Sequence, residues 1–244
     1  MSAVEALQHD SWRRQSRAFA FGLLALLLAA DLVLIGLYVL WGYDDWTWSL
    51  ENEAGPSERF QHLKWAVAAV LLIALFKRRR AMIYAAWALL FAYFSIDDAI
   101  RLHERGGSWL ARVLDLGSFE EIYHEHFSYF YLRAQEFGEL IVAASLGVII
   151  VTFLCIAWPG PDAIRDKTVT KRLIAWLVLF ALFAVGFDML HTMVWEIYPP
   201  AIELIGMIED GGEMICASLL VSGLALELGR SRAVPIFGLR RPQA

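Results

Sequence analysis

Six long runs of apolar residues constrain the fold of this chain more than any other feature. They cover residues 18–42, 57–76, 81–105, 138–158, 173–198 and 201–229. An α-helix needs about 20 apolar residues to cross the hydrocarbon core of a bilayer. Because the backbone polar groups of a segment inside lipid must be satisfied internally, each run is predicted to be a helix. The sequence therefore predicts an all-α, polytopic integral membrane bundle with six transmembrane helices.

The composition indicates that these runs make up most of the protein. Hydrophobic residues account for 59% of the 244 residues, and the mean hydropathy is +0.52. Little of the chain is left over for a separate soluble domain, so we expect a single membrane domain over residues 1–244. The longest connection, 106–137, carries mixed charges and a helix-start pattern at Ser118, Glu120 and Glu121. It is predicted to be an extramembrane helical loop.

Basic residues mark alternate connections between the apolar runs. They lie before the first run, between the second and third, between the fourth and fifth, and after the last: Arg13, Arg14, Arg17, Lys77, Arg78, Arg79, Arg80, Arg165, Lys167, Lys171, Arg172, Arg230, Arg232, Arg240 and Arg241. The positive-inside rule then predicts that both termini are cytoplasmic, in the inner (plasma) membrane of the cell. These residues form no long basic patch, so we do not expect nucleic acid as a partner.

The last apolar run carries Glu209, Asp210 and Glu213 near its middle. An acidic side chain at the centre of a bilayer costs about 3 kcal/mol on insertion scales, so three acids within five residues require a partner, a proton or a metal. Gly211 and Gly212 lie between them. No strand precedes this pair, so we interpret it as close helix packing or local loosening, and not as a phosphate-binding loop.

Acids and histidines on four of the predicted helices fall at one depth. At about 1.5 Å of rise per residue, they lie roughly 22 to 28 Å from the basic ends of their helices. The residues at this depth are Asp98, Glu139, Asp188, His191, Glu209, Asp210 and Glu213. Asp188 and His191 are three residues apart, and Glu213 is three or four residues from the other two acids of its helix, so each group shares a helix face. The sequence predicts one polar layer in the outer half of the membrane.

Facing helices that supply carboxylates and a few imidazoles are typical of dimetal sites in helical bundles. Such donors suit Fe, Mn or Zn, and the charge of the metal would offset the acids. We therefore predict a site for one or two divalent metals, with the ligands Asp98, His103, Glu139, Asp188, His191, Glu209 and Glu213. Glu209, Asp210 and Glu104 are the predicted catalytic carboxylates, and Asp97 is a further ligand candidate. The pattern lacks a second Glu-x-x-His near this layer, because Glu121 and His124 lie too far along the chain.

Several functions are compatible with this layer. The leading hypothesis is a membrane enzyme of hydrolase or oxidase type, on which a lipid or other hydrophobic substrate enters from the surrounding membrane lipids. One alternative is a proton- or cation-coupled transporter. Because six helices are few for a transporter, this alternative would favour a homo-oligomer. The other alternative is a non-catalytic membrane subunit. A purely architectural reading keeps the acids protonated or pairs them with Arg101 and Arg105.

Two further charges lie below the layer. Asp31 in the first run and Lys64 in the second both fall at about 20 Å. Since an unpaired charge at this depth is costly, we interpret them as a structural ion pair.

Overall fold

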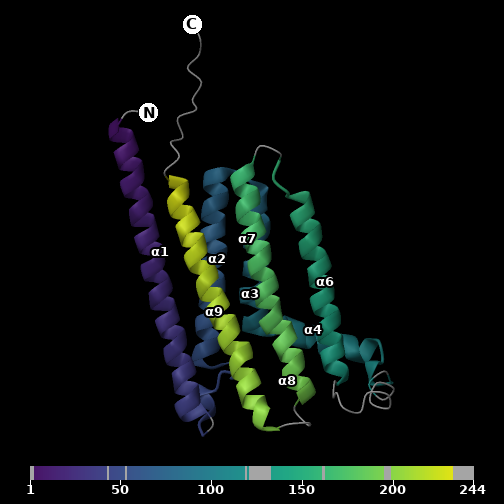
Figure 1. Ribbon diagram of the computed structural model, residues 1–244. Coiled ribbons are helices and arrows are strands. Elements are labelled where there is room, and N and C mark those ends of the chain that lie inside the picture. Colours follow the sequence, from purple (N-terminus) through teal and green to yellow (C-terminus); the bar gives the residue numbers. More distant parts are fainter. Residues whose placement is uncertain are drawn as a thin grey trace.

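The fold was analysed in a computed structural model that describes residues 3–42, 44–52, 54–118, 120, 133–160, 163–194 and 199–232. Within these residues every regular element is a helix (Figure 1). Five helices are long and apolar enough to cross a membrane, and a sixth crossing is formed if one bent pair of helices counts as a single span. The all-helical architecture predicted from the sequence is thus observed, and its length and composition are compatible with a multi-pass membrane protein.

The helices follow the predicted order but not all of the predicted boundaries. The elements are α1 (Ala3–Leu37), the π-helical turn η1 (Tyr38–Gly42), the 3-10 turn η2 (Trp46–Trp48), α2 (Pro56–Arg79), α3 (Met82–Ile100), α4 (Leu102–Val113), α6 (Ala134–Ile156), α7 (Ile164–Ala181), the π-helical segment η3 (Leu182–Phe187), α8 (Asp188–Val194) and α9 (Pro199–Arg232).

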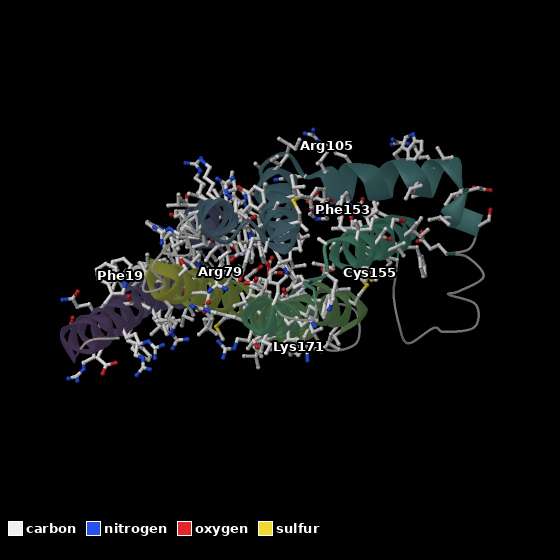
Figure 2. All side chains as sticks on the ribbon, turned by 90° about the horizontal axis from the view of Figure 1, so that it is seen from above. Phe19, Arg79, Arg105, Phe153, Cys155 and Lys171 are labelled. Carbon is white, nitrogen blue, oxygen red and sulfur yellow. The ribbon has the colours of Figure 1, made fainter. Side chains whose placement is uncertain are left out.

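Helix α9 is the central element of the bundle. It packs against α1, α2, α7, η3 and α8, and the end-on view shows α1, α9 and α7 in one row beside α2 and α3 (Figure 2). Its residues Ala217, Leu220, Val221 and Leu224 are buried in the main core. By contrast, α1 leaves large side chains such as Phe19 exposed. An apolar outer face of this kind is expected on a helix that contacts lipid.

Aromatic rings join three helices in the core. Trp65 of α2 lies 6.0 Å from Phe91 of α3 and 5.0 Å from Phe180 of α7, measured between ring centroids. Trp176 stacks on Phe180 at 5.5 Å, and its indole N–H donates to the Cys216 carbonyl of α9 at 2.7 Å. Rings in such offset and edge-on arrangements add to the burial energy of the core. These contacts fix α7 against α2, α3 and α9.

The predicted third helix, 81–105, is wrong as a single element. Arg101 adopts the left-handed conformation (φ 53°, ψ 53°) and ends α3, and α4 then leaves at 76°. Their spacing of seven residues would put Asp97 and Glu104 on one stripe of a continuous helix, but they lie on opposite sides of this break. The predicted helical loop, 106–137, is helical at both of its described ends, because α4 continues to Val113 and α6 begins at Ala134. Its position outside the membrane stays a prediction, and residues 119 and 121–132 lie outside the described residues.

The predicted ion pair between Asp31 and Lys64 is confirmed. Lys64 Nζ lies 2.7 Å from Asp31 Oδ1, and both side chains are buried, at 2% and 0% exposure. The same ammonium group also donates to the Met214 carbonyl at 2.9 Å and to Ser218 Oγ at 3.3 Å. The Ser218 hydroxyl in turn donates to Asp31 Oδ2 at 2.5 Å. All three ammonium protons and both carboxylate oxygens therefore have partners, which joins α1, α2 and α9.

Candidate functional site

A cavity of about 650 Å³ lies at the end of the bundle opposite the start of α1 and the end of α9, between α3, α4, α6, α8 and α9. Its polar part is lined by Glu51, Glu58, Asp97, Arg101, His103, Glu104, Arg133, Gln135, Glu136, Glu139, Asp188, His191, Glu209, Asp210 and Glu213. Its apolar part runs between α6 and α7 and is lined by Leu146, Ile150, Leu177, Phe180 and their neighbours. The cavity therefore has an acidic part and an apolar part.

The predicted site residues converge on this cavity. It is lined by His103, Glu139, Asp188, His191, Glu209 and Glu213 from the predicted ligands, by Glu104 and Asp210 from the predicted catalytic residues, and by Asp97. The side chain of Asp98 lies outside the described residues. The common depth of these side chains therefore corresponds to a common cavity, while their chemical roles stay predictions.

Two glycines bring α6 against α4. A Cβ atom on Gly138 would lie 2.1 Å from the Gly107 carbonyl oxygen, and one on Gly107 would lie 2.5 Å from Glu139 Cγ. No side chain fits at either position, so the helices cross in backbone contact. This crossing sets Glu136 and Glu139 on the wall of the cavity, one turn from the end of α6.

The break at Arg101 folds His103 back onto Asp97. The His103 backbone N–H donates to Asp97 Oδ1 at 2.9 Å, and the ring Nδ1 lies 3.0 Å from Oδ2. The carboxylate of Asp97 thus holds the first turn of α4 and orients the imidazole. The ring nitrogen that faces Asp97 is occupied by this contact, which leaves Nε2 as the nitrogen able to meet a ligand.

A second histidine is held on the opposite wall. His191 Nδ1 of α8 lies 3.2 Å from Glu209 Oε2 of α9. At Gly206 an added Cβ would lie 2.9 Å from Glu51 Oε1 and 3.2 Å from His191 Cε1, so the missing side chain makes room for both groups. The π-helical segment η3 directly precedes Asp188 and His191, and segments of this kind occur frequently at functional sites.

The glycine pair of α9 packs closely, as its sequence predicted. A Cβ on Gly212 would lie 2.2 Å from the Phe183 ring of η3, and one on Gly211 would lie 3.2 Å from Ile35 of α1. These contacts bring the acids on either side of the pair close to η3 and α8.

Other polar contacts tie three further acids of the cavity to neutral or basic neighbours. Gln61 Nε2 donates to Glu213 Oε2 at 2.7 Å, and Gln135 Nε2 donates to Glu139 Oε1 at 2.8 Å. Glu136 accepts from the backbone N–H and from Nε of Arg133, both at 2.6 Å. Each of these acids is therefore anchored by at least one donor.

Sequence reasoning missed Glu51 and Glu58 in this cavity. Glu51 lies between η2 and α2, in a loop to which the count of helical rise does not apply. Glu58 lies in the first turn of α2 and contacts His62 at 3.0 Å. The signal was present for Glu58, since 21 residues of helix separate it from Arg79, which places it about 31 Å from the basic end.

The predicted metal centre has no preformed ligand set in the structure. Among the residues that the structure describes, no three His, Cys, Asp or Glu side chains are grouped so that they could hold one ion. The predicted ligands meet as separate pairs, His103 with Asp97 and His191 with Glu209, along different walls. The described residues therefore do not fit a ready-made Fe, Mn or Zn centre.

The balance of charge in the cavity favours a cation. Ten carboxylates line it, together with two arginines and two histidines. Within the described part of the chain, neither Asp188 nor Asp210 has a Lys, Arg or His nitrogen within 4 Å of its carboxylate. Carboxylates that face one another without a cation cannot all ionise, so the site attracts protons or another positive group.

Comparison with known proteins gives a family but no described activity. No curated protein and no solved structure matches the chain. A family model matches residues 60–228, which is more than half of the chain and includes the cavity residues from α3 to α9. The chain therefore belongs to the family described as a domain of unknown function, DUF8692.

Proposed function

We propose that this protein is a multi-pass protein of the inner membrane whose cavity binds an amphiphilic molecule by a cationic end. In this proposal both termini are cytoplasmic and the cavity faces the opposite side. The observation that carries it is the joining of an acid-rich part and an apolar part in one cavity of about 650 Å³.

The orientation is supported by the distribution of basic residues. The N-terminal end of α1, the α2–α3 connection, the start of α7 and the end of α9 lie at one end of the bundle (Figure 1). Each of these segments is basic, and positively charged segments favour the cytoplasmic side. The cavity lies at the other end, so its ligand would come from the outer leaflet or the outer aqueous phase.

The proposal that the ligand has a cationic end is supported by two acids that have no basic partner among the described residues. Asp188 and Asp210 come from α8 and α9 and line the same cavity. An ammonium group placed between them would form charge-assisted hydrogen bonds, which are stronger than those between neutral groups. It would also relieve the repulsion that two adjacent carboxylates experience.

The hydrophobic tail is supported by the shape of the cavity. Helix α6 contacts the rest of the described chain chiefly through α3 and α4, and the side chains that face α7 across the cavity are apolar. Leu146 and Ile150 of α6 lie opposite Leu177 and Phe180 of α7. An alkyl chain between these helices would take the place of lipid against the same apolar side chains. It would enter from the membrane without crossing the polar layer.

His191 and Glu209 are the residues best placed for chemistry on such a ligand. A histidine that contacts a carboxylate is a common general base, because the carboxylate orients the ring and stabilises its protonated form. Of the three predicted catalytic carboxylates, Glu209 has this contact, whereas Asp210 follows it on α9 and Glu104 lies on α4, on the wall of His103. The reaction class that this pair favours is proton transfer or hydrolysis at the polar end of the ligand.

A proton relay through the whole bundle is less well supported. Below the cavity, Lys64 of α2 and Ser218 of α9 continue the polar groups, but the next charged side chain of α9 towards the other end is Glu227. Nine residues separate Ser218 from Glu227, which corresponds to about 13 Å of helix. Leu220, Val221 and Leu224 line most of this interval as buried core, and Ser222 is the one polar side chain of α9 within it. A coupled transporter would need a polar path there.

Ligand binding by the purified protein in a neutral detergent tests the proposal. A long-chain alkylamine should bind with at least tenfold higher affinity than the alcohol or the sulfate of the same chain length, since hydrogen bonds to charged groups contribute about 1.5–3 kcal/mol. Asp188→Asn should remove this preference, whereas Asp115→Asn, an exposed acid outside the cavity, should keep it. Equal affinity for amine, alcohol and sulfate would contradict the proposal.

Elemental analysis of the same preparations distinguishes the two sources of positive charge. The amphiphile proposal predicts no stoichiometric Fe, Mn or Zn, even after incubation with these metals. A stoichiometric metal that is lost in Asp188→Asn would instead support the metal-dependent enzyme predicted from the sequence. It would contradict the proposal that the cavity binds an organic cation.

A further inference from the structure

A second cavity, of about 380 Å³, lies at the end of the bundle where α1 begins and α9 ends. It is formed by α1, α7 and α9. Its charged lining consists of five arginines and one acid: Arg13, Arg17, Arg165, Arg172, Arg230 and Glu227. This cavity is far from the acid-rich one and does not enter the function proposed above.

Helix geometry directs these side chains to one point. Arg13 and Arg17 are four residues apart on α1, and Arg165 and Arg172 are seven apart on α7, so each pair lies on one helix face. Thr168 and Val169, which line the same cavity, occupy the intervening turns of that face of α7. The basic residues therefore form the wall of one pocket and are not scattered around the helix ends.

The single acid of the pocket already has partners. Glu227 Oε1 accepts from Arg165 Nε at 2.7 Å and from Arg79 Nη2 at 3.2 Å. Arg79, which is labelled inside this end of the bundle in Figure 2, also contacts Asp166 at 2.5 Å. Part of the negative charge of Glu227 is therefore balanced by Arg79, which does not line the pocket.

The other arginines have no such offset. Within the described chain, Arg13, Arg17, Arg172 and Arg230 have no carboxylate oxygen within 4 Å. In addition, Arg165 Nη2 is buried and has no hydrogen-bond acceptor among the described residues. A buried donor without an acceptor is costly, and a guanidinium group matches the oxygens of a phosphate in a bidentate geometry. The pocket therefore has the charge and the donors for a phosphate group.

We propose that this pocket binds the phosphate-bearing headgroup of an anionic phospholipid. The pocket lies at the ends of apolar helices, and on α1 the exposed side chains of Phe19 and Phe21 follow Arg17 directly. A headgroup among the arginines would place its acyl chains along this apolar face. Basic pockets between membrane helices on the cytoplasmic side bind anionic headgroups in the same way.

The test compares two double variants with equal loss of charge. Arg13→Gln/Arg17→Gln removes two arginines of the pocket. Arg14→Gln/Lys171→Gln removes two exposed basic residues outside it, one on α1 and one on α7, which are two of the helices that form the pocket (Lys171 is labelled in Figure 2). Binding of phosphatidylglycerol and of phosphatidylcholine to the purified protein is measured by native mass spectrometry in a neutral detergent.

We expect the wild type to prefer phosphatidylglycerol over phosphatidylcholine. The pocket variant should bind phosphatidylglycerol about 25-fold more weakly, or about fivefold for each arginine, while the control variant should change less than about twofold. Equal losses in the two variants would overturn the proposal, because they would show a general effect of surface charge. Both variants replace exposed side chains, so their thermal unfolding should match that of the wild type.

Inorganic phosphate and glycerol phosphate distinguish the lipid from a soluble anion. The proposal predicts that neither competes with phosphatidylglycerol at concentrations a hundredfold higher than that of the lipid. If either binds as tightly as the lipid, and Arg13→Gln/Arg17→Gln abolishes that binding, the pocket is a soluble-anion site and the phospholipid assignment is wrong.

Discussion

Two neighbouring polar regions of α9 differ in how their charges are satisfied. Around Ser218, the carboxylate of Asp31 and the ammonium of Lys64 are fully buried, and every one of their hydrogen-bonding atoms has a partner. Around Glu209 and Glu213, ten carboxylates line an open cavity, and Asp188 and Asp210 have no basic partner among the described residues. The first region is a closed network, and the second is an incomplete one.

The difference separates structural charge from functional charge. A buried pair with saturated hydrogen bonds can be broken only at a high cost, because the remaining partner stays buried and uncompensated. Acids that repel one another in a cavity do not stabilise the folded protein. Such acids are typical of functional sites, where a ligand or a proton neutralises their charge. The predictions below test this distinction, beginning with the largest effect on stability.

Lys64→Met should cause the largest loss of stability. It leaves the carboxylate of Asp31 buried at 0% exposure without its cation, and breaking a buried pair in this way costs about 3–5 kcal/mol. Unfolding of the purified protein by heat or by a denaturing detergent measures the effect. The double variant Asp31→Leu/Lys64→Met should recover most of the loss, and Lys77→Met, an exposed lysine of the same helix, should have none. A mild effect of Lys64→Met would contradict the closed-network interpretation.

Gly138→Ala should have the next largest effect, on the wall of the cavity. Its methyl group would lie 2.1 Å from the Gly107 carbonyl oxygen, so α6 must move away from α4. Overpacking of this kind typically costs about 1–3 kcal/mol. Gly147→Ala on the same helix is the matched control, because nothing lies within 4 Å of its added Cβ. Similar stabilities of the two variants would show that α6 is not held by this crossing.

Gln61→Leu should have a smaller effect, at the boundary between the two regions. It removes the hydrogen bond of 2.7 Å to Glu213, which is worth about 1 kcal/mol, while the loss of the buried and unpaired Gln61 Oε1 offsets part of this cost. A double-mutant cycle with Glu213→Gln measures the coupling energy. A coupling near zero would mean that the hydrogen bond between Gln61 and Glu213 does not stabilise the folded protein.

Asp188→Asn should have the smallest effect on stability, although it is proposed to abolish ligand binding. The substitution breaks no ion pair among the described residues, so the free energy of unfolding should change by no more than about 0.5 kcal/mol. Thermal unfolding without ligand measures this change. A loss above about 2 kcal/mol would place Asp188 in the same class as Asp31 and would erase the contrast between the two regions.

The sequence predicted the axial positions of the site residues better than their directions. Helical rise alone placed Glu139, Asp188 and Glu209 at one height, and all three line one cavity. The same reasoning placed Asp31 beside Lys64, which the structure confirms. Height depends only on the number of residues and on the helix ends, and both can be read from the apolar runs.

The contacts within the site could not be predicted in this way. The break at Arg101 requires a non-glycine residue in the left-handed conformation, for which the sequence gives no turn signal. It brings His103 to Asp97, whereas continuous helix geometry favoured Asp97 with Glu104. Glu51 reaches the cavity from a loop, where neither helical rise nor periodicity applies.

The π-helical segment η3 makes the site sensitive to the length of the chain. A π-helical turn contains one residue more than the α-helical turn it replaces, so Leu182–Phe187 shifts the phase of every residue that follows it in α8. Removing a single residue from this segment would restore regular α-helix and rotate Asp188 and His191 by about 100° around the helix axis. Neither side chain would then face the cavity, although the composition and apolar character of the helix would be almost unchanged. In this protein one inserted residue is enough to decide whether α7 and α8 form only a membrane helix or also a wall of the site.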